Sequence, residues 1–540
     1  MPTPPRTDAA PIALDALIAA LKNPATYPHE PESIEIVQTH ISVVALAPPY
    51  VYKIKKPVDF GFLDFSTLEQ RQHFCAREIE LNRRLCADIY ERVVPISRVG
   101  DGLRLERDAN PVEVAVKMRM LDPEHFLHHQ LNRGALSTDD LDRVMDRLEA
   151  FYAERAPSAE VAAAGRTARI KENTDENFAQ AADHVGTLLS EPAFETIRYA
   201  TDRFLDQHAR LLNERRAGGC IINGHGDLRL EHIHCTPERV CIYDCIEFND
   251  RFRHLDVAND LAFLAMDLDT NGRADLSRYI IRAMSRRLGD PDLPLLADFY
   301  KSYRAFVRGK VAGLRSEDPE IPETDRAASQ DEARRLYQWA LRYGVAGSKP
   351  MVVIVMGRVG TGKSTQAQAL GDALGWPVAS SDRVRKSLAG VPVHERADAE
   401  TRKQLYAEAM TAKTYAALFD RAEAQIEVGE GIVLDATFSK RRHRDALRER
   451  LQTVGGAHVF VELTAPDSVI QQRLDAREQS PEPEQASDAR REDFDMLSSR
   501  YEAPDALEDP FHIHASAQAS PTATTTDILK HLARLAPEAG

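Results

Sequence analysis

The chain has 540 residues, of which 43% are hydrophobic and 28% charged, and its formal net charge is −15. A chain of this length exceeds one ordinary hydrophobic core, so two or three domains are expected. An acidic surface repels phosphate backbones, which argues against bulk nucleic-acid binding.

Neither the N-terminal segment nor the cysteines indicate secretion. The stretch ALDALIAAL near the N-terminus is short and is typical of an amphipathic helix, not of a signal peptide. No stretch approaches the roughly 20 apolar residues that a membrane span needs. Six cysteines are too sparse for a disulfide framework. We therefore expect a cytoplasmic protein without a membrane segment.

The first half of the chain passes from strands to helices. Between about 34 and 120, IEIVQTHISVVALA, YVYKIKK and PVEVAVKMRM predict strands, with a helix over STLEQRQHFCAREIELNRRLCADI. Helical patterns dominate residues 137–215, strands return at GCIING and VCIYDCIEF, and helices follow over 256–342. This order predicts an α+β domain.

Two segments interrupt the second set of helices. SEDPEIPETD (316–325) is acidic and contains proline, which predicts a loop, and GVAGSKP (344–350) is typical of a domain linker. The linker predicts two domains, residues 1–345 and 346–540.

The second domain alternates strands and helices. Predicted strands at 351–356, 377–381, 431–436 and 457–464 alternate with helices at 363–374, 402–427, 441–453 and 466–478. The wholly apolar run MVVIVM is typical of a strand buried on both faces. The pattern predicts an α/β domain with a parallel sheet, followed by a mobile segment, QSPEPEQAS (479–487).

GRVGTGKST directly follows the apolar strand and opens a helix, which is the context of a phosphate-binding P-loop. Its glycines allow backbone N–H groups to surround phosphate, its lysine reaches the β and γ oxygens, and its serine binds Mg²⁺. The predicted ATP-binding residues are Gly357, Arg358, Val359, Gly360, Thr361, Gly362, Lys363, Ser364 and Thr365. Lys363 is also predicted to be catalytic, and Ser364 to be a metal ligand.

Charged residues follow the later strands of this domain. Asp382 and Arg385 lie after the second strand, Asp435 ends the third, and Arg473 and Arg477 are one helical turn apart beside the proline-rich segment. Strand ends meet at the ligand-binding edge of such sheets. Two arginines near a mobile lid can hold migrating phosphate charge.

This pattern resembles the P-loop kinases that include polynucleotide 5′-hydroxyl kinase, gluconate kinase and chloramphenicol phosphotransferase. The resemblance covers 351 to about 535, and the Asp382–Arg385 and Arg473–Arg477 spacings are most similar to the polynucleotide kinases. It implies that Asp382 is the general base, that Arg385 binds the acceptor and that Asp435 contacts a metal-bound water or the acceptor. It also implies that Arg473 and Arg477, the two arginines beside the proline-rich segment, are catalytic residues of a lid.

A second set of phosphotransfer residues lies in the first half. In GHGDLRLEH, Asp227 follows an apolar strand, and Asp244 lies at the end of the next strand. Phosphoryl transfer needs one carboxylate for the acceptor proton and another for Mg²⁺, and these two are predicted to supply them. Lys53 on a strand and Glu78 on a helix are predicted to hold the α and β phosphates.

This half, over about 30–340, resembles the aminoglycoside phosphotransferase and choline kinase group of the protein-kinase-like fold. Where that group has a metal-binding asparagine, this chain has His232, which we expect beside the metal. The turn before YVYKIKK reads ALAPPY, without a glycine-rich loop. The helix spacing favours Glu78 over Glu80. The whole chain resembles bacterial bifunctional fusions of an aminoglycoside phosphotransferase with an AAA-type ATP-binding domain.

Two weaker patterns, one of metal-binding residue types and one of paired arginines, favour structural roles. A zinc site would need ligands from the set His232, His234, Cys235, Cys241 and Cys245. Strand alternation sends these side chains to opposite faces, so buried thiols are favoured instead. Arg304 and Arg308 lie one helical turn apart and are predicted to form a solvated face, the alternative being a basic face for an acidic substrate or for the second domain.

The sequence thus predicts two phosphotransferase-type domains that use ATP and Mg²⁺ and phosphorylate a hydroxyl of a small molecule. Two alternatives stay open: a regulatory ATP-binding switch with a ligand-sensing N-terminal half, and a nucleic-acid 5′-hydroxyl end kinase. The oligomeric state and the acceptor are not specified by any motif.

Overall fold

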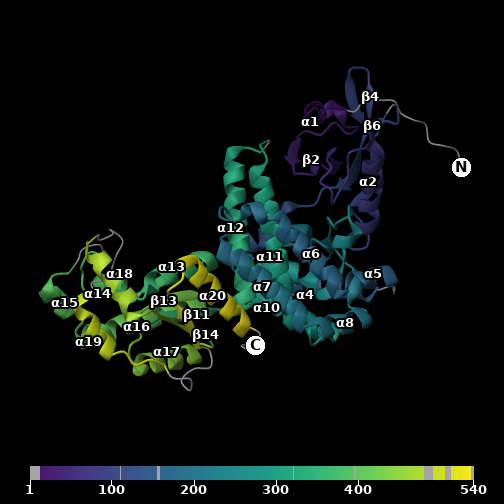
Figure 1. Ribbon diagram of the computed structural model, residues 1–540. Coiled ribbons are helices and arrows are strands. Elements are labelled where there is room, and N and C mark those ends of the chain that lie inside the picture. The colour runs from purple at the N-terminus through teal and green to yellow at the C-terminus, as the bar shows by residue number, and fades with distance from the viewer. Residues whose placement is uncertain are drawn as a thin grey trace. The chain divides into compact units, whose positions relative to one another are not determined.

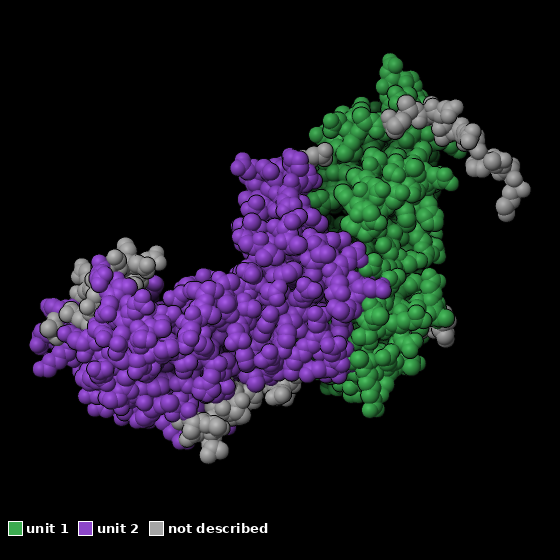
Figure 2. All heavy atoms as spheres, in the orientation of Figure 1, with its two compact units in different colours: residues 1–170, 209–300 green, residues 171–208, 301–540 purple. Residues whose placement is uncertain are grey.

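The computed structural model describes residues 12–109, 111–154, 158–319, 321–393, 397–479, 491–504 and 512–536. The chain forms two compact units, which are coloured separately in Figure 2: residues 1–170 with 209–300, and residues 171–208 with 301–540. The helices of 171–208 and 301–346 thus group with the P-loop half, whereas the linker pattern places a boundary at 345/346, which stays a prediction.

The first unit begins with an antiparallel six-stranded sheet in the order β1-β2-β3-β6-β4-β5 (Figure 1). Its strands are β1 (Glu35–Gln38), β2 (Ser42–Ala47), β3 (Tyr50–Lys55), β4 (Tyr90–Val99), β5 (Gly102–Leu105) and β6 (Pro111–Arg119). The predicted strand at 34–47 is in fact the hairpin β1–β2, and β4 and β5 were not predicted. The sheet positions Lys53, because β3 pairs with β2 on one side and β6 on the other.

Helix α2 (Leu68–Asn82) packs on this sheet. A capping box between Thr67 and Gln70 starts it. Its apolar face, including Cys75 and Ile79, joins Val116 of β6 in one core cluster. The helix ends at Asn82, earlier than predicted, where the Asn82 side chain donates to the Glu78 carbonyl and accepts from the Cys245 N–H. The helix end is thereby joined to the loop that carries Asp244.

The rest of the first unit is mainly helical with two short two-stranded sheets. Its helices are α1 (Leu14–Leu21), α3 (Leu127–Asn132), α4 (Thr138–Ala153), α5 (Ala159–Ala164), α8 (Ala209–Ala217), α9 (Val257–Thr270) and α10 (Ala274–Leu288). The strands β7 (Ile221–Asn223) and β10 (His254–Asp256) pair, as do β8 (Ile233–Cys235) and β9 (Val240–Ile242). The predicted strand at 240–248 ends at Ile242 because Asp244 adopts a left-handed backbone, with φ 63°.

The second unit contains a five-stranded parallel sheet in the order β12-β13-β11-β14-β15. The strands are β11 (Met351–Met356), β12 (Val378–Ser380), β13 (Ile432–Asp435), β14 (Ala457–Thr464) and β15 (His512–Ser516). Every residue of β11 is buried, as expected for a central strand covered on both faces. The predicted parallel α/β domain is confirmed for this part of the chain.

Three predicted helices of the second unit, 363–374, 441–453 and 466–478, match the structure to within one residue, and twelve helices are described in all. They are α6 (Thr167–Gln180), α7 (Glu191–Gln207), α11 (Leu293–Glu317), α12 (Glu323–Ala346), α13 (Lys363–Leu374), α14 (Ser381–Leu388), α15 (Ala399–Leu405), α16 (Glu408–Glu427), α17 (Arg441–Thr453), α18 (Asp467–Gln479), α19 (Phe494–Ser499) and α20 (Pro521–Leu535). The helices predicted over 402–427 are α15 and α16, and α15 begins three residues earlier than predicted. Helices α6 and α11 begin in residues of the first unit and continue into the second.

Two predicted connections are shorter than expected. Helix α12 extends through Ala346, which leaves 347–350 as the link to β11, and α11 and α12 take residues from both ends of the predicted 316–325 loop. The predicted mobile segment 479–487 lies almost wholly outside the described residues.

Candidate active sites

The P-loop connects β11 to α13. Gly357, Gly360 and Gly362 have φ of 134°, 78° and 96°, which side chains rarely tolerate. A Cβ atom at Gly357 would lie 2.4 Å from the Leu463 carbonyl oxygen, and one at Gly360 would lie 2.8 Å from Ile470. Close packing against β14 and α18 therefore holds the loop at the N-terminus of α13, where unsatisfied N–H groups and the helix dipole favour a phosphate.

Lys363 and Ser364 begin α13 and project from the loop. The Lys363 Nζ donates to the Arg358 carbonyl across the loop at 2.9 Å. The Ser364 hydroxyl donates to Asp435 Oδ2 at 2.7 Å. The structure thus brings together the predicted phosphate-binding lysine, the predicted metal ligand and the aspartate that ends β13.

Asp435 lies at the carboxyl end of the sheet, level with Val355 of β11 and Ser380 of β12. Burial raises the pKa of Asp435, and the charge of Asp382 acts in the same direction, against the opposing effect of Lys363. A buried carboxylate bonded to a serine hydroxyl is an all-oxygen donor set that fits Mg²⁺. Ser364 and Asp435 are therefore the residues that would hold the ion.

Asp382 and Arg385 lie on α14, directly after β12. The Arg385 Nη1 contacts Asp382 Oδ1 at 3.0 Å, and its guanidinium lies over the Tyr406 ring at 4.5 Å. Asp382 is close enough to Asp435 to influence its pKa. The structure therefore brings the predicted base and its arginine to the same sheet edge as the P-loop.

The two lid arginines differ in what the structure describes. Arg473 on α18 donates to the Thr361 carbonyl at 3.0 Å and to the Ala517 carbonyl at 2.6 Å, so it fastens the P-loop to the segment after β15. The side chain of Arg477 lies outside the described residues.

The other P-loop residues pack the loop. Arg358 contacts Asp467 at 2.8 Å, Thr361 donates to the Arg358 carbonyl at 2.9 Å, and Val359 belongs to a small apolar cluster with α18. Thr365 lies in the first turn of α13 with its side chain exposed.

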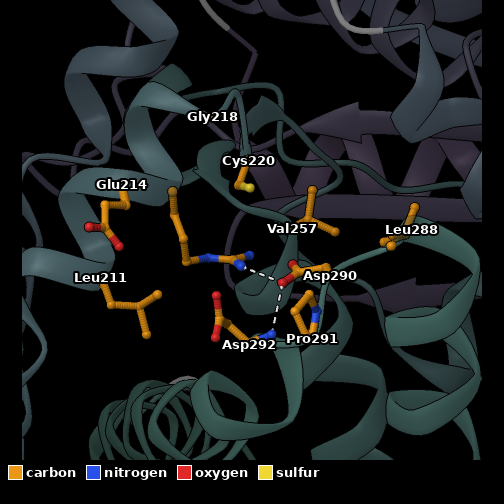
Figure 3. Close-up of a pocket in the computed structure, with 11 residues that line it drawn as sticks. Leu211, Glu214, Gly218, Cys220, Val257, Leu288, Asp290, Pro291 and Asp292 are labelled. Atoms are coloured by element: carbon orange, nitrogen blue, oxygen red, sulfur yellow. Dashed lines mark hydrogen bonds and ion pairs between the residues drawn. The ribbon is translucent and has the colours of Figure 1, made fainter.

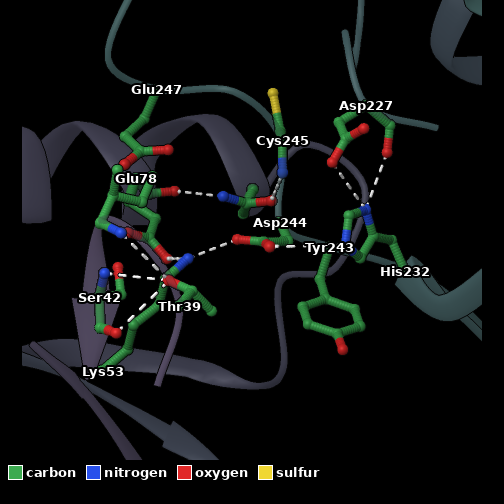
Figure 4. Close-up of polar contacts among 12 residues, drawn as sticks. Thr39, Ser42, Lys53, Glu78, Asp227, His232, Tyr243, Asp244, Cys245 and Glu247 are labelled. Carbon is green, nitrogen blue, oxygen red and sulfur yellow. Dashed lines mark hydrogen bonds and ion pairs between the residues drawn. The ribbon is translucent and has the colours of Figure 1, made fainter. Parts of the chain in front are cut away.

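In the first unit, one lysine joins the strand, the helix and the loop that were predicted to meet (Figure 4). The Lys53 Nζ lies 3.0 Å from Glu78 Oε1 and 2.5 Å from Asp244 Oδ1. Burial acts to lower the pKa of Lys53, but the charges of Asp244, Glu78 and Glu247 outweigh it and raise the pKa well above its usual range. Glu80, the alternative partner, pairs instead with Arg77 at the surface.

Asp227 lies in the loop after β7, which a buried aspartate of α9 holds in place. Asp260 accepts from the backbone N–H groups of His225 and Gly226, each at 2.9 Å. Burial acts to raise the pKa of Asp227, but the charge of Arg229 and two histidines outweigh it, so the pKa is lowered. The loop therefore presents Asp227 as an ionised carboxylate.

His232 lies between the two predicted carboxylates. Its Nδ1 is 2.8 Å from the Asp227 carbonyl oxygen and 3.5 Å from Asp227 Oδ2, and its Nε2 is 3.5 Å from Asp244 Oδ2 (Figure 4). Asp227 and Asp244 thus flank one imidazole, at the position where the resembling enzymes place asparagine.

Two residues of this site were not predicted. Lys55 is fully buried and contacts Glu78 Oε2 at 2.7 Å and the Glu247 carboxylate. Burial, together with the charge of Glu78, raises the pKa of Glu247 against the opposing effect of Lys55. The spacing in YVYKIK places Lys53 and Lys55 on one face of β3, and this was the available signal.

The cysteines and histidines of the zinc alternative do not form a metal cluster in the described part of the chain. Cys241 is disulfide-bonded to Cys86, which follows α2, while Cys235 and Cys245 are buried thiols. The expectation that these cysteines are all free thiols was therefore wrong for Cys241, which is bonded to Cys86. The two bonded cysteines are 155 residues apart in the chain, so only tertiary folding brings them together.

The predicted solvated face of α11 was also wrong. Arg304 is 5% exposed, and Arg308 pairs with Glu332 of α12 at 2.7 Å. Both arginines pack within the second unit because α11 is covered on this side.

A cavity of about 340 Å³ in the first unit lies apart from this chemistry (Figure 3). It is lined by Arg215, Cys220, Val257 and Asp290 among others. Each nitrogen of the Arg215 guanidinium donates one hydrogen bond, two of them to Asp256 at 2.7 and 2.8 Å and one to Asp290 at 2.7 Å. None of the lining residues belongs to either candidate site.

Among the described residues, no helix is long and apolar enough to cross a membrane.

Comparison with known proteins defines the class of the second unit. Residues 352–504 match the family model described as "AAA domain". Gluconokinase of Gluconobacter oxydans is 34% identical over 104 residues, which are 19% of this chain and 53% of that protein. The second unit therefore carries a kinase-like P-loop nucleotide-binding domain.

The chain as a whole has longer relatives. "Uncharacterized protein Rv2004c" of Mycobacterium tuberculosis (strain ATCC 25618 / H37Rv) is 31% identical over 444 residues, 82% of this chain and 86% of that protein. "Uncharacterized protein Mb2027c" of Mycobacterium bovis matches over the same lengths. The chain belongs to the family of these mycobacterial proteins.

Two solved structures match about a third of the chain. A gluconokinase from Sinorhizobium meliloti 1021 is 24% identical, covers 35% of this chain and 95% of that chain, and gives a TM-score of 0.27. Shikimate kinase from Aquifex aeolicus is 14% identical, covers 34% of this chain and 96% of that chain, and gives a TM-score of 0.24.

Proposed function

We propose that the second unit transfers the γ-phosphoryl group of ATP to a hydroxyl of a small molecule. The observation that carries this proposal is the junction at the sheet edge: the Ser364–Asp435 bond beside the P-loop, with the Asp382–Arg385 pair on the adjoining strand end. A nucleotide-binding switch needs the first feature but has no use for the second. The partial match to a gluconokinase supports a small acceptor.

In the proposed reaction the chain positions three groups. The P-loop N–H groups and Lys363 hold the phosphates, and Asp382 accepts the proton of the acceptor hydroxyl. The acceptor oxygen then bonds to the γ phosphorus as the bond to the β–γ bridging oxygen breaks, and ADP leaves. Bound at Ser364 and Asp435, Mg²⁺ would neutralise phosphate charge.

The arginines have separate proposed roles. Arg385 would release Asp382 to contact the acceptor, since both partners of this ion pair lie at the sheet edge. Arg473 positions the P-loop through the Thr361 carbonyl. Arg477 is proposed to stabilise the migrating phosphoryl charge as a lid residue.

A second phosphotransferase-type site in the N-terminal domain, 1–345, is proposed on a different observation. Lys53 bridges Glu78 and Asp244, and His232 links Asp244 to Asp227. This arrangement is similar to that of the aminoglycoside phosphotransferase and choline kinase group, with histidine at the metal-side position. Asp227 is the proposed base, and Asp244 with His232 the proposed metal ligands.

The test is acceptor-dependent ADP release, followed by mass spectrometry of phosphorylated metabolites. Wild-type protein and Asp382→Asn would be given a hydroxyl-bearing metabolite extract and, separately, gluconate. We expect Asp382→Asn to lower acceptor-stimulated turnover about 10²-fold or more while ATP binding is kept. Asp372→Asn, an exposed site on α13, is the matched control.

Different results would favour the alternatives. ATP binding without turnover under any acceptor would contradict the kinase proposal and support a regulatory switch. Phosphorylation of a 5′-hydroxyl oligonucleotide, with no small-molecule product, would instead identify a nucleic-acid end kinase. The Asp227→Asn variant in a Lys363→Ala background assigns any remaining turnover to the N-terminal domain.

A further inference from the structure

One cluster outside both candidate sites has the donor set of a transition-metal site. It consists of Glu462 on β14 and of His512 and His514 on β15, and these are the only three His, Cys, Asp or Glu residues in the described part of the chain whose ligand atoms all lie within 4.8 Å of one another. Neither the P-loop chemistry nor the N-terminal site uses them.

The strand pairing explains why the three side chains converge. β15 is the edge strand and runs parallel to β14, with Phe460 opposite His512 and Glu462 opposite His514. Residues two apart on a strand point to the same face. The His-x-His pair therefore projects on the face that also carries Glu462.

The distances among the three side chains are compatible with a shared metal ion. Glu462 Oε2 lies 3.1 Å from His514 Nδ1 and 3.6 Å from His512 Nε2. Ligands bound tetrahedrally to Zn²⁺ at its usual bond lengths are about 3.4 Å apart. The ligand nitrogens of the two histidines lie within 4.8 Å of each other.

Burial and hydrogen bonding also favour a built site. The side chains of Glu462 and His512 are each 6% exposed, whereas that of His514 is 64% exposed and leaves a path for an ion. The Tyr501 hydroxyl donates to Glu462 Oε1 at 2.6 Å, which orients the carboxylate and leaves Oε2 for the histidines. Such outer bonds to a ligand are typical of metal sites.

We propose that Glu462, His512 and His514 bind one Zn²⁺ ion, with water completing the coordination. Two imidazoles and one carboxylate suit zinc-like ions, whereas Mg²⁺ takes oxygen ligands and would stay at the P-loop. The ion would fasten the edge strand β15 to β14, level with Met356, the residue before the P-loop.

The test is Zn²⁺ binding to the chelator-treated full chain, measured by competition with a chromophoric chelator in excess Mg²⁺ without nucleotide. We expect one tight equivalent in the wild type, weakened about 100-fold in His514→Asn and about tenfold in Tyr501→Phe. Because His514 is exposed, its replacement leaves folding intact. His531→Asn, on α20, is the matched control and should bind as the wild type does.

A second readout separates binding at this site from loose binding elsewhere. Zn²⁺ should raise the melting temperature of the wild type and of His531→Asn but not of His514→Asn, because only binding to the folded site stabilises it. Equal affinity and equal thermal shifts in wild type and His514→Asn, or no tight equivalent at all, would overturn the proposal.

Discussion

The P-loop and the N-terminal site differ in how their charged groups are satisfied before a ligand arrives. At the P-loop, Lys363 bonds to a backbone carbonyl, and much of the phosphate-binding surface is backbone N–H. In the first unit, Lys53 already bridges Glu78 and Asp244. A bound phosphate would take the place of the Arg358 carbonyl at Lys363, whereas at the second site a nucleotide must compete with carboxylates for the lysine.

This difference separates binding from stability. Removing the P-loop lysine deletes a phosphate contact and a bond to a backbone carbonyl, but it leaves Glu78 and Asp244 paired. Removing the strand lysine deprives Asp244 of its cation and leaves the buried Glu78 with Lys55 alone, which costs folding free energy. The two lysines are similar in proposed role. Replacing Lys363 should nevertheless lower turnover with little change in stability, whereas replacing Lys53 should lower stability.

The largest expected effect is on turnover. Lys363→Ala should lower the ATP turnover of the P-loop unit at least about 10³-fold, because the developing phosphate charge loses its cation. The melting temperature should change little. Steady-state ADP release and a thermal scan measure the two effects, with the exposed Lys403→Ala on α15 as the control. Loss of folding in Lys363→Ala would contradict the comparison.

The next effect is on stability. Lys53→Met should destabilise the first unit by up to about 3 kcal/mol at neutral pH, since Asp244 would lose its cation and Glu78 would keep only Lys55. Urea unfolding followed by a probe in the first unit measures it.

The pH dependence of that loss follows from the carboxylates. The folded-state pKa values of Glu78 and Asp244 are lowered: burial opposes this, but Lys53 outweighs it. Their contribution to the stability of the fold is therefore present above the unfolded pKa values, 4.5 for Glu78 and 3.8 for Asp244. It disappears as the pH falls through the lower folded pKa values. Wild type and Lys53→Met should converge in acid, and a constant difference down to pH 3 would disprove the pairing.

A smaller effect is expected at the histidine between the carboxylates. His232→Asn replaces an imidazole with an oxygen donor between Asp227 and Asp244, so the N-terminal site should bind Mg²⁺ about tenfold more tightly. Mg²⁺ titration of ATP turnover in a Lys363→Ala background isolates this site. Unchanged Mg²⁺ dependence would mean that His232 does not lie at a metal position.

The smallest effect is expected at Asp435. Burial raises the pKa of this carboxyl, so ionisation at neutral pH opposes folding. Asp435→Asn should therefore raise the melting temperature of the nucleotide-free protein by a few degrees. The gain should shrink as the pH falls through the raised folded value and vanish below 3.8, the ordinary value, where the wild-type carboxyl becomes protonated in both states. A lower melting temperature at neutral pH would contradict the burial argument.

How far the sequence predicted each site depends on how local the site is. The P-loop is continuous in the chain, so its residues, helix start and strand were all predictable, and the observed bounds of β11 and α13 match the prediction. The Lys53–Glu78 pair required a resemblance, because a strand and a helix 25 residues apart meet only through sheet packing. Lys55 and Glu247 were missed because two lysines on one strand face do not show which carboxylates they meet.

Errors were concentrated where tertiary contacts override local pattern. The end of the predicted strand at 240–248 is set by the left-handed backbone of Asp244, and the end of α2 by the bond between Asn82 and the Cys245 N–H. The burial of Arg304 depends on which helices cover α11.

The sequence by itself determined the parallel α/β order of the second unit and its phosphate-binding loop, since both depend on hydrophobic period and on glycines at fixed spacing. Only the tertiary structure decided the position of His232 between two aspartates, the Cys86–Cys241 bond and the convergence of Glu462 with two histidines. Each of these joins side chains from different elements, and the packing of those elements, rather than their local sequence, sets the distance between the side chains.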